Sequence, residues 1–411
     1  MSASDPSYHR ARQGLRKHTL GLLAWFGSIM LVFGFLATWV NPLWITPSPW
    51  SSASFDHYKP VHKHPRLGKT GLVRSGKWDA ILLGSSRVDI AFDPQHPAFG
   101  DLRVANLALR GGTITEHRAM LEYAYARQPL KLVVVGVDLA DLTSRHDVLD
   151  VAGFQESPLS ESGDPFEKEL RYRFGTSAFE MSVKTLDYRF TKRLSAYSPQ
   201  GQWVRQLDKR PLRQVLQYES FMWANRFIKE RHKGIAGNPD KVEDYRQIIR
   251  FCLDHHLRLF LCIPPNHAAF LSVFRLKGDP DPGFRTDREI MTSVIAEETQ
   301  GNDASSITLW DFNDFHPYNC EALPPIDQPR KPTYYWADGT HALPTLGSIM
   351  LSRMMDLPPA HPEDATYGTP LTTENLDDRE QTLRDGYLRY QKDHPEDFAW
   401  VENHMNLWKP N

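Results

Sequence analysis

The chain has 411 residues, a formal net charge of −2, 41% hydrophobic residues and 24% charged residues. This near-neutral balance provides no basic face for phosphates, so nucleic acid is not expected as a partner. The apolar content is ordinary for a globular protein, and the length suffices for one large domain with insertions or for two domains.

An apolar run near the N-terminus predicts a membrane anchor. Residues 20–40 are 21 residues without a charge, and as a helix they would be roughly 32 Å long, enough for a bilayer core of about 30 Å. Four basic residues precede the run: Arg10, Arg12, Arg16 and Lys17. We therefore expect residues 1–19 in the cytoplasm, a single-pass helix in the inner (cytoplasmic) membrane, and the remainder on the periplasmic side. A cleaved signal peptide is the alternative, but the apolar run is longer than the usual signal region.

Residues 41–77 are rich in proline and predict a linker between the anchor and a domain. Beyond them, apolar strands alternate with amphipathic helices, which predicts a parallel sheet covered on both faces. The expected strands are 79–84, 103–109, 131–139, 257–265 and 306–312. The expected helices are 115–128 (with Thr115 as N-cap), 242–256, 286–300 and 343–356. The predicted fold class is α/β, in a flavodoxin-like three-layer α/β/α arrangement.

Two segments lie outside this alternation. Residues 140–241 read as a helical insertion after the third strand, forming a lid or a substrate wall. Residues 357–411 read as a charged helical tail, so the core domain is expected to cover residues 78–356. Three cysteines form no metal-binding or disulfide pattern, and no metal is expected: Cys252, Cys262 and Cys320. The first two lie in a helical and a strand pattern, as core thiols do.

A serine pair follows the first expected strand, at the sheet edge where open parallel sheets bind ligands. Near the other end of the chain, Asp338 and His341 lie three residues apart just before a helix. A serine nucleophile needs a base, and the base needs an acidic group to orient it. An Asp-x-x-His loop can supply both. Taken singly, each stretch is also ordinary turn chemistry, with Asp338 as a helix cap and His341 on the surface.

The joint pattern resembles the SGNH/GDSL hydrolase superfamily. Gly84-Ser85-Ser86 stands where this family has its Gly-Asp-Ser block, and residues 338–341 match its terminal Asp-x-x-His block. The stretch 106–112 resembles its second block, where a glycine N–H lines the oxyanion hole. The resemblance implies Ser86 as nucleophile, with His341 as base and Asp338 as the orienting acid. It also implies an oxyanion hole formed by the N–H groups of Ser86 and Gly111, and no metal or organic cofactor.

The sequence departs from the family pattern in its third block. Residues 136–141 put Asp138 near the place of the asparagine that normally donates to the oxyanion, and an ionised carboxylate there would repel that charge. Either Asn106 supplies the missing donor, or Asp138 faces away and pairs with Arg87 or Arg110. An α/β-hydrolase elbow is disfavoured because its second glycine, two residues after the serine, is absent.

Three further side chains are candidates for contact with a substrate. Arg87 could bind an anionic group such as a uronate, or it could pair with an aspartate such as Asp89. Trp336, in the aromatic run 334–336, could stack on sugar rings or belong to the core. His267 lies just past a strand end, where it could touch a substrate or simply begin a helix.

The resemblance extends to membrane-anchored proteins of alginate and other exopolysaccharide O-acetylation systems. It implies an O-acetyltransferase or acetylesterase acting on a cell-envelope polysaccharide or exopolysaccharide, with a membrane-bound acyltransferase or an export complex as partner. The alternative is a catalytically inactive SGNH-like binding or scaffold subunit of a polysaccharide synthesis or export complex. The Ser–Asp–His set favours the enzyme, and Asp138 favours the inactive subunit.

Overall fold

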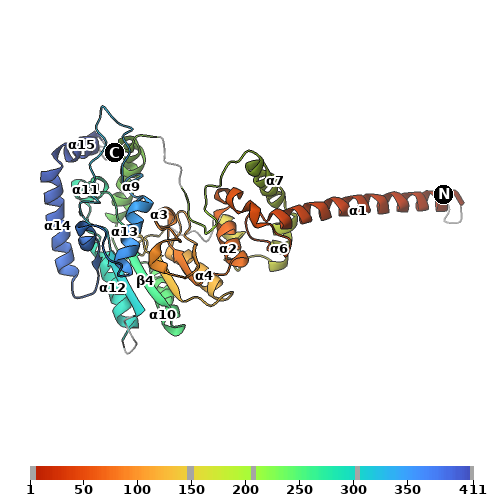
Figure 1. The fold of residues 1–411 in the computed structure, drawn as a ribbon, viewed down its shortest axis with the longest axis horizontal. Coiled ribbons are helices and arrows are strands. Elements are labelled where there is room, and N and C mark those ends of the chain that lie inside the picture. The colour runs from red at the N-terminus through yellow and green to blue at the C-terminus, as the bar shows by residue number, and fades with distance from the viewer. Residues whose placement is uncertain (1–5, 146–151, 205–209, 301–305, 408–411) are drawn as a thin grey trace.

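The computed structural model of the protein describes residues 6–145, 152–204, 210–300 and 306–407 (Figure 1). Within these residues, six strands form one sheet in the order β2-β1-β3-β4-β5-β6. The strands are β1 (Ala80–Leu83), β2 (Val104–Asn106), β3 (Leu132–Gly136), β4 (Arg258–Ile263), β5 (Ile307–Asp311) and β6 (Thr369–Pro370). The first five pair in parallel, and β6 pairs antiparallel with β5. The predicted α/β class and the mainly parallel sheet are confirmed, while β6 was not predicted.

The strand register brings the ends of the central strands to one edge. Leu83 at the end of β1 lies opposite Val135 of β3, and Gly136 of β3 lies opposite Cys262 of β4. Valine-rich runs suit such strands because both of their faces are buried. Residues that follow β1, β3 and β4 therefore share the carboxyl edge of the sheet.

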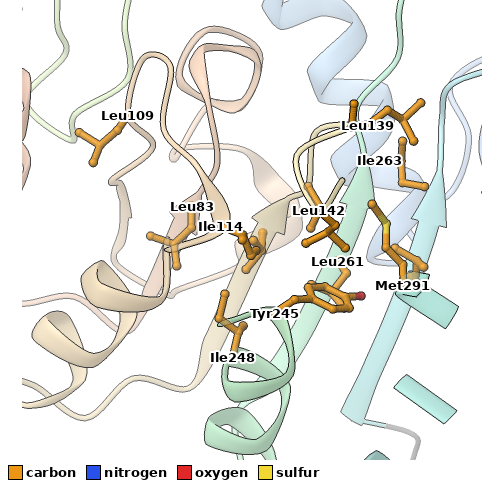
Figure 2. Packing of buried hydrophobic residues seen from close by; sticks show 14 of the residues in the cluster. Leu83, Leu109, Ile114, Leu139, Leu142, Tyr245, Ile248, Leu261, Ile263 and Met291 are labelled. Atoms are coloured by element: carbon orange, nitrogen blue, oxygen red, sulfur yellow. The ribbon is translucent and has the colours of Figure 1, made fainter. Parts of the chain in front are cut away.

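Helices cover both faces of the sheet. On one face, Leu82 and Val134 share a buried cluster with residues of α3 and α13. On the other face, Leu83 and Leu261 pack with residues of α4 and α10 (Figure 2). The helices around the sheet are α3 (Ser86–Ala91), α4 (Ile114–Tyr125), α10 (Pro239–Asp254), α11 (Ala268–Leu276), α12 (Arg285–Glu298) and α13 (Pro344–Met354). The N-cap residue of α4 is Thr113 rather than Thr115, so the helix starts two residues earlier than expected. All three cysteines are buried, as predicted for Cys252 and Cys262.

The N-terminal helix α1 (Pro6–Val40) is continuous and projects away from the rest of the molecule (Figure 1). Its residues 12–40 are long and apolar enough to span a membrane. Most of its large apolar side chains are exposed, whereas Ala37 and Val40 near its end are buried by other parts of the chain. The part of α1 closest to the domain is therefore packed on one side.

The predicted linker is largely folded. It contains η1 (Ala53–Tyr58), η2 (Val61–Lys63) and helix α2 (Pro65–Ser75). Helix α2 starts with a proline, which is well suited to the first helical position, and Leu72 and Val73 join the main core. The prolines of this segment thus begin and separate short helices, and the domain starts well before residue 78.

The two halves of the insertion pack against different parts of the molecule. Helices α6 (Pro165–Phe174) and α7 (Thr176–Phe190) gather around the end of α1, whereas α9 (Phe221–Arg231) lies beside α11 (Figure 1). The remaining elements are α5 (Ala152–Gln155), α8 (Leu212–Val215) and the single π-helical turn η4 (Leu216–Ser220). Residues 146–151 and 205–209 of the predicted insertion lie outside the described residues.

The C-terminal segment completes the domain. It holds η6 (Pro362–Thr366), α14 (Leu376–Asp393) and α15 (Pro395–Leu407). The Arg379 guanidinium of α14 donates to Asp311 at the end of β5, over 2.7 Å. Arg213 of α8 likewise donates to Asp397 of α15, over 2.7 Å. These buried contacts make the expected tail an integral part of the fold, except for residues 408–411, which lie outside the described residues.

Candidate active site

The turn after β1 fixes the two predicted serines in different roles. Gly84 has a φ of +151°, a conformation that favours glycine, and a Cβ atom there would lie 2.5 Å from Val88. Ser85 is the N-cap of α3, and its Oγ accepts from the backbone N–H of Arg87 over 3.3 Å. Ser86 is the first residue of α3. With Ser85 used as the cap, the Ser86 hydroxyl is left to interact across the sheet edge.

The predicted Asp-x-x-His stretch is the turn of a small hairpin. Trp336 and Ala342 form an antiparallel bridge at its base. Asp338 Oδ1 accepts from the backbone N–H groups of Thr340 and His341, each over 2.9 Å. The carboxylate therefore holds the turn that carries the histidine, in addition to any contact with the imidazole ring.

Ser86, His341 and Asp338 form one hydrogen-bonded series. His341 Nε2 lies 2.7 Å from Ser86 Oγ, and His341 Nδ1 lies 2.7 Å from Asp338 Oδ2. Since a carboxylate only accepts, Nδ1 carries the proton and Nε2 accepts from the serine hydroxyl. This is the arrangement in which a histidine can act as base toward a serine. The fold thus brings together residues that are 255 positions apart in the sequence.

The second half of the insertion supports the His341 turn. A Cβ atom on Gly339 would lie 2.7 Å from the Leu216 side chain and 3.0 Å from Ser220 Oγ. The Gly339 carbonyl accepts from the backbone N–H of His267 over 3.0 Å. A larger residue at position 339 would require the Leu216 side chain to move, so the glycine allows the turn to lie close to η4.

Two predicted substrate contacts have structural roles instead. The Trp336 side chain is fully buried, and its Nε1–H donates to the Tyr318 carbonyl over 2.8 Å. His267 is also fully buried; its Nδ1 accepts from Ala269 N–H over 3.1 Å, and its Nε2–H donates to the Glu321 carbonyl over 2.8 Å. Burial lowers the pKa of His267 to about 4, which keeps this bonded ring neutral. Both rings are thus held inside the protein by hydrogen bonds, and Trp336 also forms part of the wall of a groove beside the His341 turn.

Asn106, predicted as a possible oxyanion donor, is occupied elsewhere. Its amide N–H groups donate to the carbonyls of Val88 and Phe92, each over 3.0 Å. Its Oδ1 accepts from Ala108 N–H over 3.1 Å. Both amide hydrogens are used to tie β2 to the region of α3, so this side chain has no donor left for an oxyanion.

The second predicted block forms a turn beside the serines. The Leu109 N–H donates to the Gly84 carbonyl over 2.8 Å, so the 109–112 turn is held against the end of β1. Gly111 is exposed and has a φ of +66°. Gly112 uses its N–H within the turn, donating to Leu109 over 2.9 Å. Of the two glycines, Gly111 is the better candidate for donation to a ligand.

Asp138 lies at the same edge, two residues after β3, and is paired with Arg87. The Arg87 Nε is 3.7 Å from Asp138 Oδ1, which is an ion pair but too long for a hydrogen bond. Arg110, the other expected partner, instead lies over the Trp203 ring at 3.9 Å. Within the described parts of the chain, Asp138 Oδ1 and Arg87 Nη1 are buried without a hydrogen-bond partner. The cation that follows Ser86 in the sequence is thus paired with an anion from the segment after β3.

A buried ion pair that the sequence did not indicate holds the helix of Ser86. Lys69 Nζ of α2 donates to Asp89 Oδ1 over 2.6 Å and to two backbone carbonyls over 2.8 and 2.5 Å. The Tyr197 hydroxyl of the insertion donates to Asp89 Oδ2 over 2.9 Å. Asp89 is one turn along α3 from Ser86, so α2 and the insertion together fix the position of that helix. The residue types of α2 do not single out Lys69, because Arg66 and Arg74 are also basic residues of this helix.

A groove of about 400 Å³ adjoins the His341 turn. Its lining includes Ala337, directly before Asp338, and three cationic residues: Arg210, Arg330 and Lys331. Tyr334, on the same loop, is 64% exposed. A second hollow of about 10 Å³, lined in part by Arg87 and Thr340, is about the size of one water molecule. Of these two hollows, only the groove beside the His341 turn exceeds the size of a water molecule.

No protein-family model matches the chain, and no curated protein matches it by sequence. Across the described ranges, no group of three or more His, Cys, Asp or Glu side chains is arranged to hold a metal ion. A function must therefore be inferred from the residues and their geometry.

Proposed function

We propose that this protein is a membrane-anchored, extracytoplasmic serine acyl-ester enzyme of the SGNH type. It would act as an O-acetyltransferase or acetylesterase on a cell-envelope polysaccharide or exopolysaccharide. The observation that carries the proposal is the unbroken series of hydrogen bonds from Ser86 through His341 to Asp338. Such a series supports attack by a serine hydroxyl on an acyl carbon.

The fold that we propose for the domain is the flavodoxin-like three-layer arrangement. Its support is the order β2-β1-β3-β4-β5 of the parallel strands, which is the order of flavodoxin-like sheets. In that order the chain changes direction between β1 and β3, and ligands bind at this switch point. Ser86 follows β1 and Asp138 follows β3, so the candidate site occupies the expected place.

In the proposed mechanism, His341 Nε2 removes the proton from Ser86 Oγ as this oxygen attacks the carbonyl carbon of an acyl ester. Asp338 stabilises the imidazolium that forms. Backbone N–H groups of Ser86 and Gly111 donate to the tetrahedral oxyanion. His341 then returns the proton to the departing alcohol, leaving an acyl ester on Ser86. In the second half, His341 deprotonates a sugar hydroxyl or a water molecule, whose oxygen attacks the acyl carbon. The bond between that carbon and Ser86 Oγ breaks, and His341 returns the proton to Ser86 Oγ.

The groove beside the His341 turn supports a polymeric acceptor. Its cations Arg330 and Lys331 would attract acidic sugar units, while Arg210 in the same lining is paired with Glu219. The exposed ring of Tyr334 could stack on a sugar. Helix α1, which is apolar enough to cross a bilayer, would hold this groove at the membrane. A membrane-bound acyltransferase or export complex is the partner class that would supply acyl groups or polymer there.

The second candidate is an SGNH-like binding or scaffold subunit without catalysis. Asp138 favours this candidate, because it lies near the sequence position where the family has its donor asparagine. Asn106 favours it as well, because both of its amide hydrogens already donate to backbone carbonyls. Loss of one such donor lowers a rate by about a hundredfold or more. The groove would then bind polysaccharide without any acyl transfer.

Hydrolysis of p-nitrophenyl acetate by the full chain in detergent separates the two candidates. The enzyme predicts that Ser86→Ala lowers kcat/KM by about a thousandfold or more. Ser85→Ala is the matched control and removes only a helix cap, which costs about 1 kcal/mol of stability. Equal background rates for the wild type and Ser86→Ala would support the binding subunit. Addition of an acceptor polysaccharide then distinguishes transfer from hydrolysis.

A further inference from the structure

The α6–α7 hairpin packs along the last part of α1. The Phe179 ring stacks on Phe33 of α1 with 4.2 Å between centroids, and a Cβ atom on Gly34 would collide with the Phe174 ring. Phe174 and Phe179 flank the tip of the hairpin. Farther from the tip, Tyr172 and Met181 share a buried cluster with residues that follow α1, namely Leu43 and Ile45. The tip is therefore the part of the hairpin nearest the apolar centre of α1.

These contacts lie within the stretch of α1 that a membrane span would use. A span that begins after the basic residues, at Leu20, needs about 20 residues and so reaches Trp39. The hairpin contacts begin at Phe33, and residues 33–40 amount to the last ~12 Å of the helix. On the opposite side of α1, Val32 and Phe35 stay exposed at the same level. One side of this stretch is thus covered by the hairpin, and the other side is left for lipid.

The hairpin itself carries exposed apolar side chains. Phe166 and Leu170 lie one turn apart on α6, and Val183 and Phe190 lie two turns apart on α7. The exposed fractions of Phe166 and Phe190 are 69% and 84%. Large exposed apolar patches usually mark a binding surface. On a helix that lies at a membrane surface, basic side chains can extend to the lipid headgroups.

Two tryptophans lie near the end of α1, close to the part that the hairpin contacts. Trp39 near the end of α1 is partly exposed, and Trp50 is 54% exposed. The Trp50 Nε1–H donates to Thr38 Oγ1 over 3.0 Å, so its ring is held beside the end of α1. Tryptophan is enriched where a membrane meets water. The hairpin therefore lies where the outer membrane–water interface is expected.

We propose that the α6–α7 hairpin lies in the outer interface of the membrane that α1 spans, with Phe166, Leu170, Val183 and Phe190 in contact with lipid. The occupant of this surface is the bilayer, because the hairpin packs on α1 at Phe33 and Gly34, within the stretch that would span the membrane. The proposal rests on the anchor role of α1 and does not depend on catalysis by Ser86. Two contacts with the membrane restrict the tilt of the domain, whereas a single helix would let it pivot.

Single-cysteine labelling of the full chain in phosphatidylcholine vesicles tests this proposal. The three native cysteines are buried, so an NBD fluorophore can be attached to Phe166→Cys or Phe190→Cys. Leu23→Cys in α1 is the positive control. Leu388→Cys is the negative control, because it is 60% exposed on α14, at the opposite end of the molecule from α1 (Figure 1). Unchanged urea unfolding midpoints establish that each variant is folded.

We expect NBD at positions 166 and 190 to be quenched by lipids that carry a nitroxide near the headgroup and to be protected from aqueous iodide. NBD at position 388 should show the reverse. Because the vesicles contain only this protein, a partner protein cannot cause the protection. If positions 166 and 190 behave like position 388 while position 23 is quenched by lipid, the hairpin proposal is wrong and the anchor stands. If position 23 also fails to respond to lipid, the anchor fails as well, and the hairpin proposal is overturned with it.

Discussion

Different kinds of contact stabilise the two ends of the molecule. At the carboxyl edge of the sheet, Ser86, His341 and Asp338 are fixed by short, directional bonds between a few polar atoms. At the α1 end, the α6–α7 hairpin is fixed by ring packing such as that of Phe33 on Phe179. A polar network loses much when one atom is removed, because the buried partner is left unpaired. Apolar contacts are individually weak and add up over many atoms. Single substitutions should therefore act strongly at the first end and weakly at the second.

The largest effect is expected from Asp338→Asn. An asparagine oxygen can still accept from the backbone of the turn, but the side chain no longer stabilises a charged imidazole and favours the wrong tautomer of His341. We expect kcat/KM for p-nitrophenyl acetate to fall by about a hundredfold to ten-thousandfold, with an almost unchanged unfolding midpoint. A rate equal to that of the wild type would remove Asp338 from the mechanism.

The next effect concerns the ion pair beneath Ser86. Lys69→Met leaves the buried Asp89 carboxylate without its cation, and breaking such a pair typically costs about 3–5 kcal/mol. Urea unfolding measures this loss, and Lys77→Met, on the exposed residue just after α2, is the matched control. The double variant Lys69→Met with Asp89→Asn should recover part of the stability. If Lys69 positions the helix, labelling of Ser86 by a fluorophosphonate should also slow in the folded single variant. A single variant as stable as the wild type would show that the pair contributes nothing.

A smaller, pH-dependent effect is expected at the end of β5. Burial alone would raise the pKa of Asp311, but Arg288 and Arg379 outweigh burial and hold it at about 2. This value is below the pKa of an unfolded aspartate. The interaction of Asp311 with the two arginines therefore stabilises the fold above about pH 4, and the stabilisation is lost as the pH falls through 2. A difference of this size is worth about 2–3 kcal/mol. Melting curves of the wild type and Asp311→Asn should differ at pH 7 and converge toward pH 2.5. A difference in melting temperature between the two proteins that does not change with pH would contradict a lowered pKa of Asp311.

The smallest effect is expected at the hairpin. Phe190→Ser changes a side chain that is 84% exposed in the protein, so unfolding in detergent should shift by no more than ~0.5 kcal/mol. Only simultaneous replacement of Phe166, Leu170, Val183 and Phe190 should release the hairpin from vesicles, measured as lost nitroxide quenching of NBD on Thr176→Cys at its tip. Strong destabilisation by Phe190→Ser alone would mean that this ring packs inside the protein.

The sheet could be predicted because it depends on local signals, such as the apolar run around Val133–Val135. The Gly-Ser-Ser and Asp-x-x-His stretches, taken singly, indicated only turns. That Ser86 and His341 meet across 255 positions was expected from the resemblance of the joint pattern to SGNH hydrolases, and not from either stretch.

The remaining roles depend on partners that are distant in the sequence. Asn106 is occupied because Val88 and Phe92 direct their carbonyls at it, and His267 is occupied by Glu321. Neither contact leaves a signal in the residue types. The prolines of 41–77 suggested a linker, but the segment is folded: Leu72 and Val73 pack in the main core, and Lys69 donates to the buried Asp89. Tertiary contacts, rather than local propensity, decided these cases.

The most direct test of the proposed chemistry is covalent labelling of the full chain in detergent with a fluorophosphonate, followed by peptide mass mapping. We predict a single adduct on Ser86, its loss in His341→Ala, and its retention in Ser85→Ala. Absence of any adduct in the folded wild type, or an adduct that persists in Ser86→Ala, would contradict a serine nucleophile at this site.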